Sequence, residues 1–227
     1  MKLVLWDIDH TLIATRGVGG EIFGDAFEQV TGIPMRQQAA VDGMTEPVIF
    51  RRTAELHGIT SDRTMFEDFA RHSAELHRQR AQDLRERGHA LPGAAAALAE
   101  LAATDGVVQS VVTGNIRPVA EIKLQVFGLD DHIRFPYGGY GEDHDDRAEL
   151  VRTAIARTRA ATGAEIALDD VLLVGDTPAD VAAGRAAGVP VLAVATGRTS
   201  AADLVDAGAT ATVRSLQDAS PLHDLLR

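Results

Sequence analysis

The 227-residue sequence contains no cysteine. Disulfide bonds, thiolate metal sites and thiol nucleophiles are therefore excluded. The sequence also lacks any apolar run near the roughly 20 residues that cross a bilayer. Its first predicted strand begins at the second residue, which leaves no room for a signal peptide. We therefore expect a soluble cytoplasmic protein that does not work in or on a membrane.

Positive charge is also scarce, since 22 Lys and Arg residues face 33 Asp and Glu residues and the formal net charge is −11. Such a field repels nucleic acid and anionic membranes, so neither is expected as the main partner. A small anionic substrate would need a local positive site or a metal ion. Because 45% of the residues are hydrophobic, the chain can bury the core of one large domain, or of a domain with an insertion.

The first apolar stretch ends in two aspartates. Leu3 to Trp6 predict a strand that is buried on both faces, and Asp7 follows at its carboxyl end, with Asp9 close behind. In an open parallel α/β sheet, ligands bind at this edge, so the pair is placed for chemistry. The alternative is that both are ordinary turn or helix-capping residues.

Further apolar segments alternate with helical ones. Strands are predicted at 107–112, 171–174 and 191–194, with a weaker strand at 133–137 and an edge strand at 211–213. Helices are predicted near 93–103, 118–127, 148–161, 178–187 and 201–206. This alternation indicates an α/β fold with a doubly wound parallel sheet and right-handed crossovers.

Residues 16–87 differ, because they contain helical segments without a convincing strand. After a flexible glycine-rich connection at 17–20, helices are predicted at 21–31, at 45–57 and as one long polar helix from 61 toward 88. Three histidines of these polar helices are interpreted as surface residues: His57, His72 and His77. We therefore predict an α/β core of residues 1–15 and 88–227 and an inserted all-helical domain of residues 16–87.

Polar residues follow three of the predicted strands: Asp7 and Asp9; Thr113, Gly114 and Asn115; and Asp176 and Asp180. Carboxylates that converge on one point repel each other unless a cation lies between them. Oxygen ligands without cysteine or clustered histidine suit Mg²⁺. The hydroxyl, glycine and amide of residues 113–115 lie at a strand-to-helix junction, where they can hold a phosphate group. The sequence therefore predicts a metal site and a phosphate site together.

Three motifs occur in order: DIDHT at 7–11, VVTGN at 111–115 and VGDTPAD at 174–180. Their spacing and strand context resemble the haloacid dehalogenase-like (HAD) hydrolase superfamily, in its phosphoglycolate phosphatase-like branch. The resemblance implies that Asp7 is a nucleophile that forms an aspartyl-phosphate, with Asp9 as general acid and then base. It implies that Thr113 holds a phosphate oxygen, and that Asp7, the Asp9 backbone carbonyl and Asp176 bind Mg²⁺. Asp180 would be a secondary ligand or would orient the site, unless it only stabilises a helix N-terminus.

Two positions depart from the pattern of that family. The lysine-proline motif, whose basic residue pairs with the nucleophile and phosphate, is absent. Lys123 is the favoured substitute, because it lies on the apolar stripe of the helix predicted at 118–127, where a lysine needs an anion. A snorkelling side chain is the alternative, and Arg147 is the rival candidate. His10 stands where many relatives have glycine, and we assign it no role.

In this family, a helical insertion after the first strand corresponds to a C1-type cap, which closes over the active site and contacts the leaving group. Specificity is then expected in the cap, for a small phosphorylated metabolite. Candidate cap contacts are Arg16, Met44, Thr45 and Arg51. Residues 17–20 are a hinge or a plain loop. A monomer and a homodimer are both compatible with the sequence.

The leading interpretation is a Mg²⁺-dependent phosphatase for a small phosphomonoester. A dehalogenase and a phosphonate hydrolase are disfavoured, because those branches lack the second aspartate, which this sequence keeps as Asp9. A β-phosphoglucomutase-like phosphotransferase uses both aspartates and stays open. A non-catalytic protein that binds a phosphorylated ligand on the same fold also stays open, although its expected signature is loss of Asp7 or Asp9.

Overall fold

The computed structural model describes residues 1–218 and 220–226. Its centre is a five-stranded sheet in the order β4–β1–β5–β6–β7, in which all neighbouring strands are parallel. The strands are β1 (Lys2–Trp6), β4 (Val107–Val111), β5 (Val171–Gly175), β6 (Val191–Val194) and β7 (Ala211–Val213). Because β1 pairs with both β4 and β5, it is an interior strand of the sheet. The aspartate that follows β1 therefore has a neighbouring strand end on each side.

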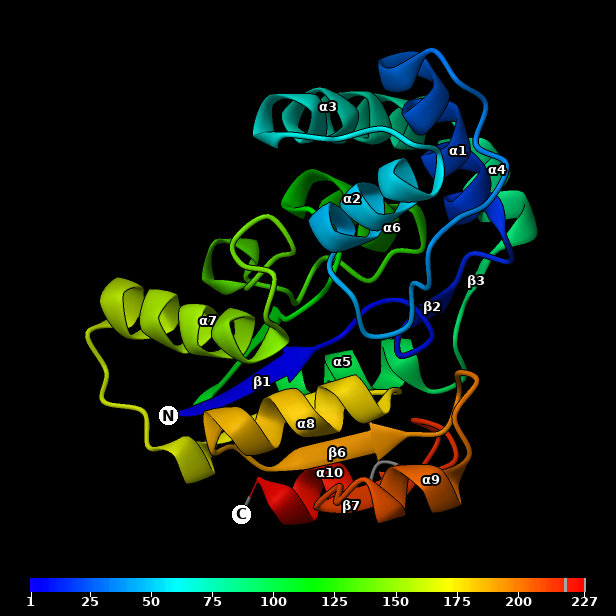
Figure 1. Ribbon diagram of the computed structural model, residues 1–227. Coiled ribbons are helices and arrows are strands. Elements are labelled where there is room, and N and C mark those ends of the chain that lie inside the picture. Colours follow the sequence, from blue (N-terminus) through cyan, green and yellow to red (C-terminus); the bar gives the residue numbers. More distant parts are fainter. Residues whose placement is uncertain (219, 227) are drawn as a thin grey trace.

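Helices cover both faces of the sheet (Figure 1). Successive side chains of a strand point to opposite faces, so Val4 and Trp6 join one buried cluster while Leu3 and Leu5 join the other. The first cluster includes residues of α5 (Ala94–Ala102), α6 (Arg117–Val126) and α10 (Ser220–Leu225). The second includes residues of α7 (Arg147–Thr162), α8 (Pro178–Ala187) and α9 (Ala201–Asp206). The predicted doubly wound α/β fold is confirmed.

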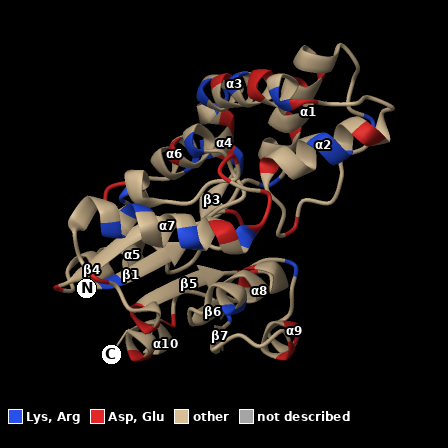
Figure 2. Cartoon of the chain, turned by 60° about the vertical axis from the view of Figure 1, so that its left-hand side comes forward, with Lys and Arg blue, Asp and Glu red and all other residues tan. Residues whose placement is uncertain are grey.

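Apart from Lys2 in β1, the Lys, Arg, Asp and Glu residues of the described chain lie on helices and loops (Figure 2). This follows from burial, because a charge in the interior needs a partner to offset its desolvation. No helix in the described part of the chain is both long and apolar enough to cross a membrane.

The weak strand predicted at 133–137 is wrong. This segment instead forms a short 3₁₀ helix, η1 (Phe135–Tyr137), and a second one, η2 (Leu168–Asp170), precedes β5. Pro136 has no N–H to donate to a sheet ladder, which disfavours a strand there. The hydroxyl of Tyr140 donates to the Phe135 carbonyl at 2.6 Å and stabilises the turn. Only an isolated bridge between Val112 and Gly139 extends the sheet at this point.

Four helices lie together above the edge of the sheet where β1 ends (Figure 1). They are α1 (Val18–Thr31), α2 (Glu46–Leu56), α3 (Arg63–Gln79) and α4 (Ala81–Arg87). Their own core is aromatic, with Phe23, Phe27, Phe50 and Phe69 packed against one another. The chain leaves the sheet through β2 (Ile13–Ala14) and returns through β3 (His89–Ala90), which pair antiparallel. We call residues 16–87 the cap; the predicted insertion begins and ends next to this ribbon.

Two local predictions within the cap are wrong. Gly19 and Gly20 are not a flexible connection, because they lie in the first turn of α1; Gly17 precedes the helix with a φ of 93°, a conformation that favours glycine. The single helix expected from 61 toward 88 is divided at Arg80 into α3 and α4. Arg80 forms an ion pair with Glu21, which ties the break to α1, and a second one with Asp83 of α4.

Candidate active site

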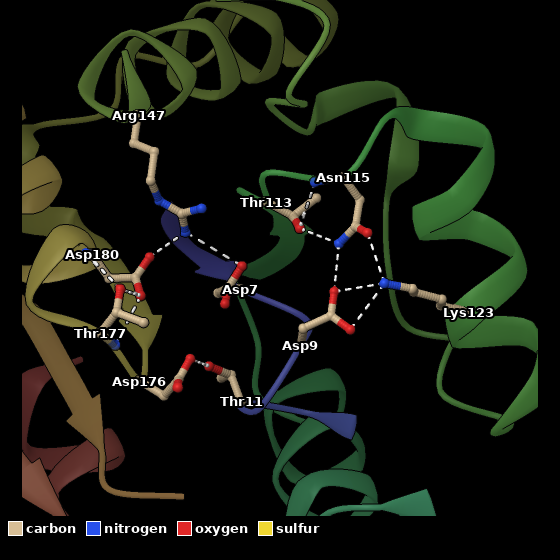
Figure 3. A network of polar contacts seen from close by, with 10 residues as sticks. All are labelled: Asp7, Asp9, Thr11, Thr113, Asn115, Lys123, Arg147, Asp176, Thr177 and Asp180. Atoms are coloured by element: carbon tan, nitrogen blue, oxygen red, sulfur yellow. Dashed lines mark hydrogen bonds and ion pairs between the residues drawn. The ribbon is translucent and has the colours of Figure 1, made fainter. Parts of the chain in front are cut away.

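The carboxyl ends of three neighbouring strands bring the predicted site residues together (Figure 3). Asp7 follows β1, Thr113 lies beyond β4 and Asp176 follows β5. A cavity of about 560 Å³ is lined by these three residues and by the other predicted site residues: Asp9, Gly114, Asn115, Lys123 and Asp180. The motifs meet in one place because parallel strands end at the same edge of a sheet.

Three buried carboxylates gather on one side of the cavity. Asp7, Asp176 and Asp180 each offer an oxygen within 4.8 Å of the others. The Nη2 atom of Arg147 lies 3.3 Å from Asp7 Oδ1 and also contacts Asp180 Oδ1, while the Thr11 hydroxyl donates to Asp176 Oδ1 at 3.3 Å. Burial, and then repulsion from neighbouring carboxylates, raises the pKa of both Asp7 and Asp176. One guanidinium therefore leaves this cluster with excess negative charge.

Asp180 is fixed by the helix that it begins. Its Oδ2 accepts hydrogen bonds from the backbone N–H of Thr177 at 3.0 Å and from the Thr177 hydroxyl at 2.6 Å, and Asp180 N–H donates back to that hydroxyl. This is a capping box at the start of α8. A Cβ at Gly175 would lie 2.4 Å from Asp180 Cγ, so the close approach needs glycine. With Oδ2 held by Thr177 and Oδ1 by Arg147, Asp180 is placed to orient the cluster.

Asp9 turns to the other side of the cavity and has a different environment. Lys123 Nζ donates to its two carboxylate oxygens at 2.9 and 2.7 Å, and Asn115 Nδ2 donates at 2.8 Å. Burial works to raise the pKa of Asp9, but the charge of Lys123 and the hydrogen bonds from Lys123 and Asn115 outweigh it and lower the pKa. The two aspartates of one motif are thus held in opposite electrostatic surroundings.

The structure changes the assignment of the two basic residues. Lys123 was the favoured partner of Asp7, and it is indeed buried on the inward face of α6. Its ammonium group, however, contacts Asp9 and the Asn115 side chain. The cation beside Asp7 is Arg147, the first residue of α7. Helical spacing predicted that Lys123 faces inward, but it carried no information on which of the two carboxylates it meets.

Residues 113–115, predicted to hold a phosphate group, make different contacts. Thr113 Oγ1 accepts hydrogen bonds from the Asn115 side chain at 2.8 Å and from its backbone N–H at 3.3 Å. Within the described chain, no hydrogen bond uses the hydroxyl hydrogen of Thr113. Gly114 lies under the cap, where its carbonyl accepts from Glu46 N–H at 2.8 Å and an added Cβ would lie 2.2 Å from the Met44 carbonyl oxygen. Of the three residues, Thr113 therefore has the side-chain donor best placed for a ligand.

The cap supplies the opposite wall of the cavity. Of the candidate cap contacts, Arg16 and Met44 line the cavity. Thr45 is buried outside the lining as the N-cap residue of α2. Arg51 points away from the cavity to Asp145, with its Nη2 2.9 Å from Oδ2.

A buried glutamate joins cap and core. Glu46, at the start of α2, accepts a hydrogen bond from the backbone N–H of Ile116, the N-cap residue of α6, at 3.0 Å. Its other oxygen accepts from the Ser73 hydroxyl at 3.3 Å. At the cavity mouth, Arg198 lies 3.6 Å from Asp42 of the cap. The sequence motifs did not single out these residues, because the contacts join segments distant in sequence.

Two histidines line the cavity. His10 has a φ of 62°, a left-handed conformation that glycine adopts at less cost than histidine. His77, predicted at the surface, is only 3% exposed. Its inward position had a weak signal in the sequence, because Phe69 and Ser73 precede it at helical spacing on α3 and are buried with it.

Residues 4–194 match the sequence model of a haloacid dehalogenase-like hydrolase. The chain belongs to this family. The resemblance seen in the three motifs is therefore confirmed, and with it the assignment to the hydrolase class. A comparison with curated protein sequences gave no match.

Solved structures of other proteins have the same fold as this HAD-like hydrolase. A hydrolase from Pseudomonas syringae is 20% identical with a TM-score of 0.69, over 99% of this chain and 98% of the other. A candidate β-phosphoglucomutase from Bacteroides vulgatus is 18% identical with a TM-score of 0.65, over 100% and 88%. A predicted phosphoglycolate phosphatase from Haemophilus somnus is 16% identical with a TM-score of 0.65, over 98% of both chains. At these identities the likeness concerns the fold.

Proposed function

We propose that this HAD-like hydrolase is a Mg²⁺-dependent phosphatase that acts on a small phosphomonoester through an aspartyl-phosphate on Asp7. The observation that carries the proposal is the contrast between Asp7 and Asp9. Asp7 faces Arg147 within an acidic cluster, whereas Asp9 is held by Lys123 and Asn115 on the other side of the cavity. Two carboxylates in different surroundings suit two different roles.

The acidic cluster fits a magnesium ion. Its donors are carboxylate oxygens, which Mg²⁺ prefers, and one guanidinium does not balance three carboxylates. Asp7, Asp176 and the backbone carbonyl of Asp9 would hold the ion, with Asp180 as their orienting neighbour. When bound, the ion would offset negative charge on the transferred phosphoryl group.

The reaction needs two steps. A carboxylate oxygen of Asp7 attacks phosphorus, the bond from phosphorus to the ester oxygen breaks, and protonated Asp9 gives its proton to the departing alkoxide. Asp9 then removes a proton from water as that water attacks the aspartyl-phosphate, which releases inorganic phosphate and restores Asp7. A phosphate dianion beside Asp9 raises the pKa of that carboxyl group and so favours the protonated form that the first step requires.

Other residues of the site position the groups that react. Lys123 and Asn115 hold Asp9 in place through direct hydrogen bonds. Arg147 can bind a phosphate oxygen while it keeps Asp7 oriented. The hydroxyl of Thr113 can donate to another phosphate oxygen.

The test is phosphate release from a panel of small phosphomonoesters that includes phosphoglycolate, with and without Mg²⁺. We expect metal-dependent release that disappears in Asp7→Asn. A matched control is Asp170→Asn, since Asp170 pairs with Lys2 at the opposite end of β1, where a lost carboxylate leaves the site intact. Absence of release above the Asp7→Asn background, with folded protein, would contradict the proposal and favour a binding role.

A phosphotransferase is the second candidate, because the cavity is roofed by the cap and both aspartates are in place. Phosphotransfer moves the aspartyl-phosphate to a second hydroxyl rather than to water. Product analysis with a hexose phosphate separates the two functions: isomerised hexose phosphate indicates transfer, and free hexose with inorganic phosphate indicates hydrolysis.

A further inference from the structure

Asp9 is held by two residues of one continuous segment (Figure 3). Asn115 Nδ2 donates to Asp9 Oδ2 at 2.8 Å, and Asn115 Oδ1 accepts from Lys123 Nζ, also at 2.8 Å. Asn115 lies in the loop that follows β4, and Lys123 lies two turns along α6, whose N-cap residue is Ile116. The orientation of the Asp9 carboxyl group therefore depends on where this loop and the start of α6 are held.

Glu46 of the cap contacts the residue on each side of Asn115. Its backbone N–H donates to the Gly114 carbonyl at 2.8 Å, and its Oε2 atom accepts from the Ile116 N–H at 3.0 Å. A carboxylate at the N-terminus of α6 is also favoured by the helix dipole. The cap thus holds the backbone of this loop at two points that are separated by one residue.

The Glu46 side chain is itself buried and fixed. Its residue is 8% exposed, and its Oε1 atom accepts from the hydroxyl of Ser73, a fully buried residue of α3, at 3.3 Å. The ion pair of Arg51 with Asp145 also joins cap and core, but its side chains are 46% and 52% exposed. Because exposed ion pairs hold their partners weakly, Glu46 is the better placed of these contacts to fix the loop.

We propose that Glu46 is a positioning residue for proton transfer by Asp9. It transmits the docked position of the cap, through the loop of residues 114–116, to the two side chains that orient Asp9. The proposal rests on the proposed function, in which Asp9 protonates the leaving group. Glu46 takes no part in bond breaking, and a residue that served only to cap α6 would affect stability without a selective effect on proton transfer.

The first experiment measures how the rate depends on the leaving group. It compares kcat/KM in excess Mg²⁺ for p-nitrophenyl phosphate and for the alkyl phosphomonoester that the wild type cleaves fastest. An alkoxide needs a proton as it departs, whereas p-nitrophenolate is a stable anion that departs without one. We expect Glu46→Met to lower kcat/KM for the alkyl ester by about tenfold or more, since a positioned general acid contributes roughly 10²–10⁴, and to change the p-nitrophenyl ester little.

Two further variants show whether the hydrogen bonds carry this effect. Glu46→Gln keeps an oxygen that can accept from the Ile116 N–H and an amide that can donate to the Ser73 hydroxyl, so it should keep most of the alkyl-ester rate. Lys123→Met removes hydrogen bonds from Asp9 directly and should show the same selective loss as Glu46→Met.

The matched control is Arg51→Met. It removes the exposed cap–core ion pair with Asp145, away from the loop of residues 114–116, so both esters should keep their rates. A Glu46→Met variant that loses the same factor with both esters, or that loses nothing with either, overturns the proposal.

A nuclear magnetic resonance measurement separates this proposal from the proposed function. Asn115 is the only asparagine in the sequence, so ¹⁵N-labelled asparagine gives a single side-chain amide signal pair. Its two hydrogens are bonded to Asp9 and Thr113, and their exchange with solvent should become several-fold faster in Glu46→Met but not in Arg51→Met. Faster exchange supports the positioning by Glu46 even if no ester is hydrolysed. Unchanged exchange overturns it, whatever the result for phosphate release.

Discussion

The guanidinium of Arg147 is the group whose removal tests the acidic cluster most directly. Arg147→Met keeps much of the side-chain volume but leaves Asp7 and Asp180 without their cation. The three side chains concerned are deeply buried, with exposures of 8% for Arg147, 10% for Asp7 and 1% for Asp180. Solvent therefore cannot replace the lost charge.

The expected loss is large for one substitution. Removal of one partner of a buried ion pair costs about 3–5 kcal/mol. We expect the lower end, about 3 kcal/mol, because raised pKa values allow carboxylates of the cluster to take up protons and become neutral. In a protein of this size, that corresponds to a melting temperature lower by roughly 6–12 °C.

Thermal unfolding in EDTA and in excess Mg²⁺ provides the assay. An ion that binds the folded protein raises its stability, and the variant site has one more uncompensated negative charge, so Mg²⁺ should raise the melting temperature of Arg147→Met more than that of the wild type. In EDTA, the stability that Arg147→Met loses relative to the wild type should become smaller toward pH 5.5. A carboxyl group with a raised pKa makes the folded state bind protons, so the folded state gains stability as the pH falls.

Arg152→Met is the matched control on the same helix. Arg152 pairs with Glu149 at the surface, where both side chains are more than 40% exposed, and such pairs contribute about 0–1 kcal/mol. Two results would refute this prediction: the two variants unfold at the same temperature in EDTA, or Mg²⁺ stabilises neither of them. Either result would mean that the buried carboxylates are not stabilised by a cation.

Three further outcomes are expected. Lys123→Met removes two of the hydrogen bonds that hold the Asp9 carboxyl group in position for proton transfer, so phosphate release should fall roughly 100-fold in kcat; an unchanged kcat contradicts the positioning role of Lys123. Gly114→Ala places a Cβ 2.2 Å from the Met44 carbonyl oxygen, so the unfolding free energy in urea should drop by about 1–3 kcal/mol, and a wild-type midpoint speaks against the observed cap contact. The pKa of His77 is lowered from 6.5 to about 4. Because the unfolded chain binds the extra proton in this window, the contribution of His77 to the free energy of unfolding should fall by about 3 kcal/mol as the pH falls from 6.5 to 4. His77→Phe removes this contribution. Urea titrations at both pH values should therefore show that the variant becomes more stable relative to the wild type by that amount at the lower pH. An equal difference in unfolding free energy at the two pH values contradicts the burial of a neutral ring.

Much of the core could be predicted because its signals are local. The apolar run before Asp7 specifies a strand buried on both faces, and the parallel order of such strands places Asp7, Thr113 and Asp176 at one edge. Glycine and proline marked several helix ends well, as at Gly32 after α1 and Pro178 in the first turn of α8.

The failures concern features that depend on distant contacts. Nothing near Arg80 in the sequence announces a break, because its partner Glu21 lies on α1. The choice between Lys123 and Arg147 depends on where the last turn of α6 and the first turn of α7 lie relative to the two aspartates, and helical spacing carries no information on this. His77 was misplaced because the many charges of α3 concealed a narrow inward face.

The pairing of β2 with β3 has a consequence for how such enzymes can change. Because the chain departs and returns through two adjacent strands, the ends of residues 16–87 already touch, and a segment with touching ends can be exchanged at little cost in loop closure. The cap can therefore be replaced as a unit. A different set of helices joined to β2 and β3 would form a new cap wall of the cavity and leave the aspartates of the core unchanged. Chimaeras joined within β2 and β3 could therefore change the substrate preference while the catalytic residues of the core stay the same.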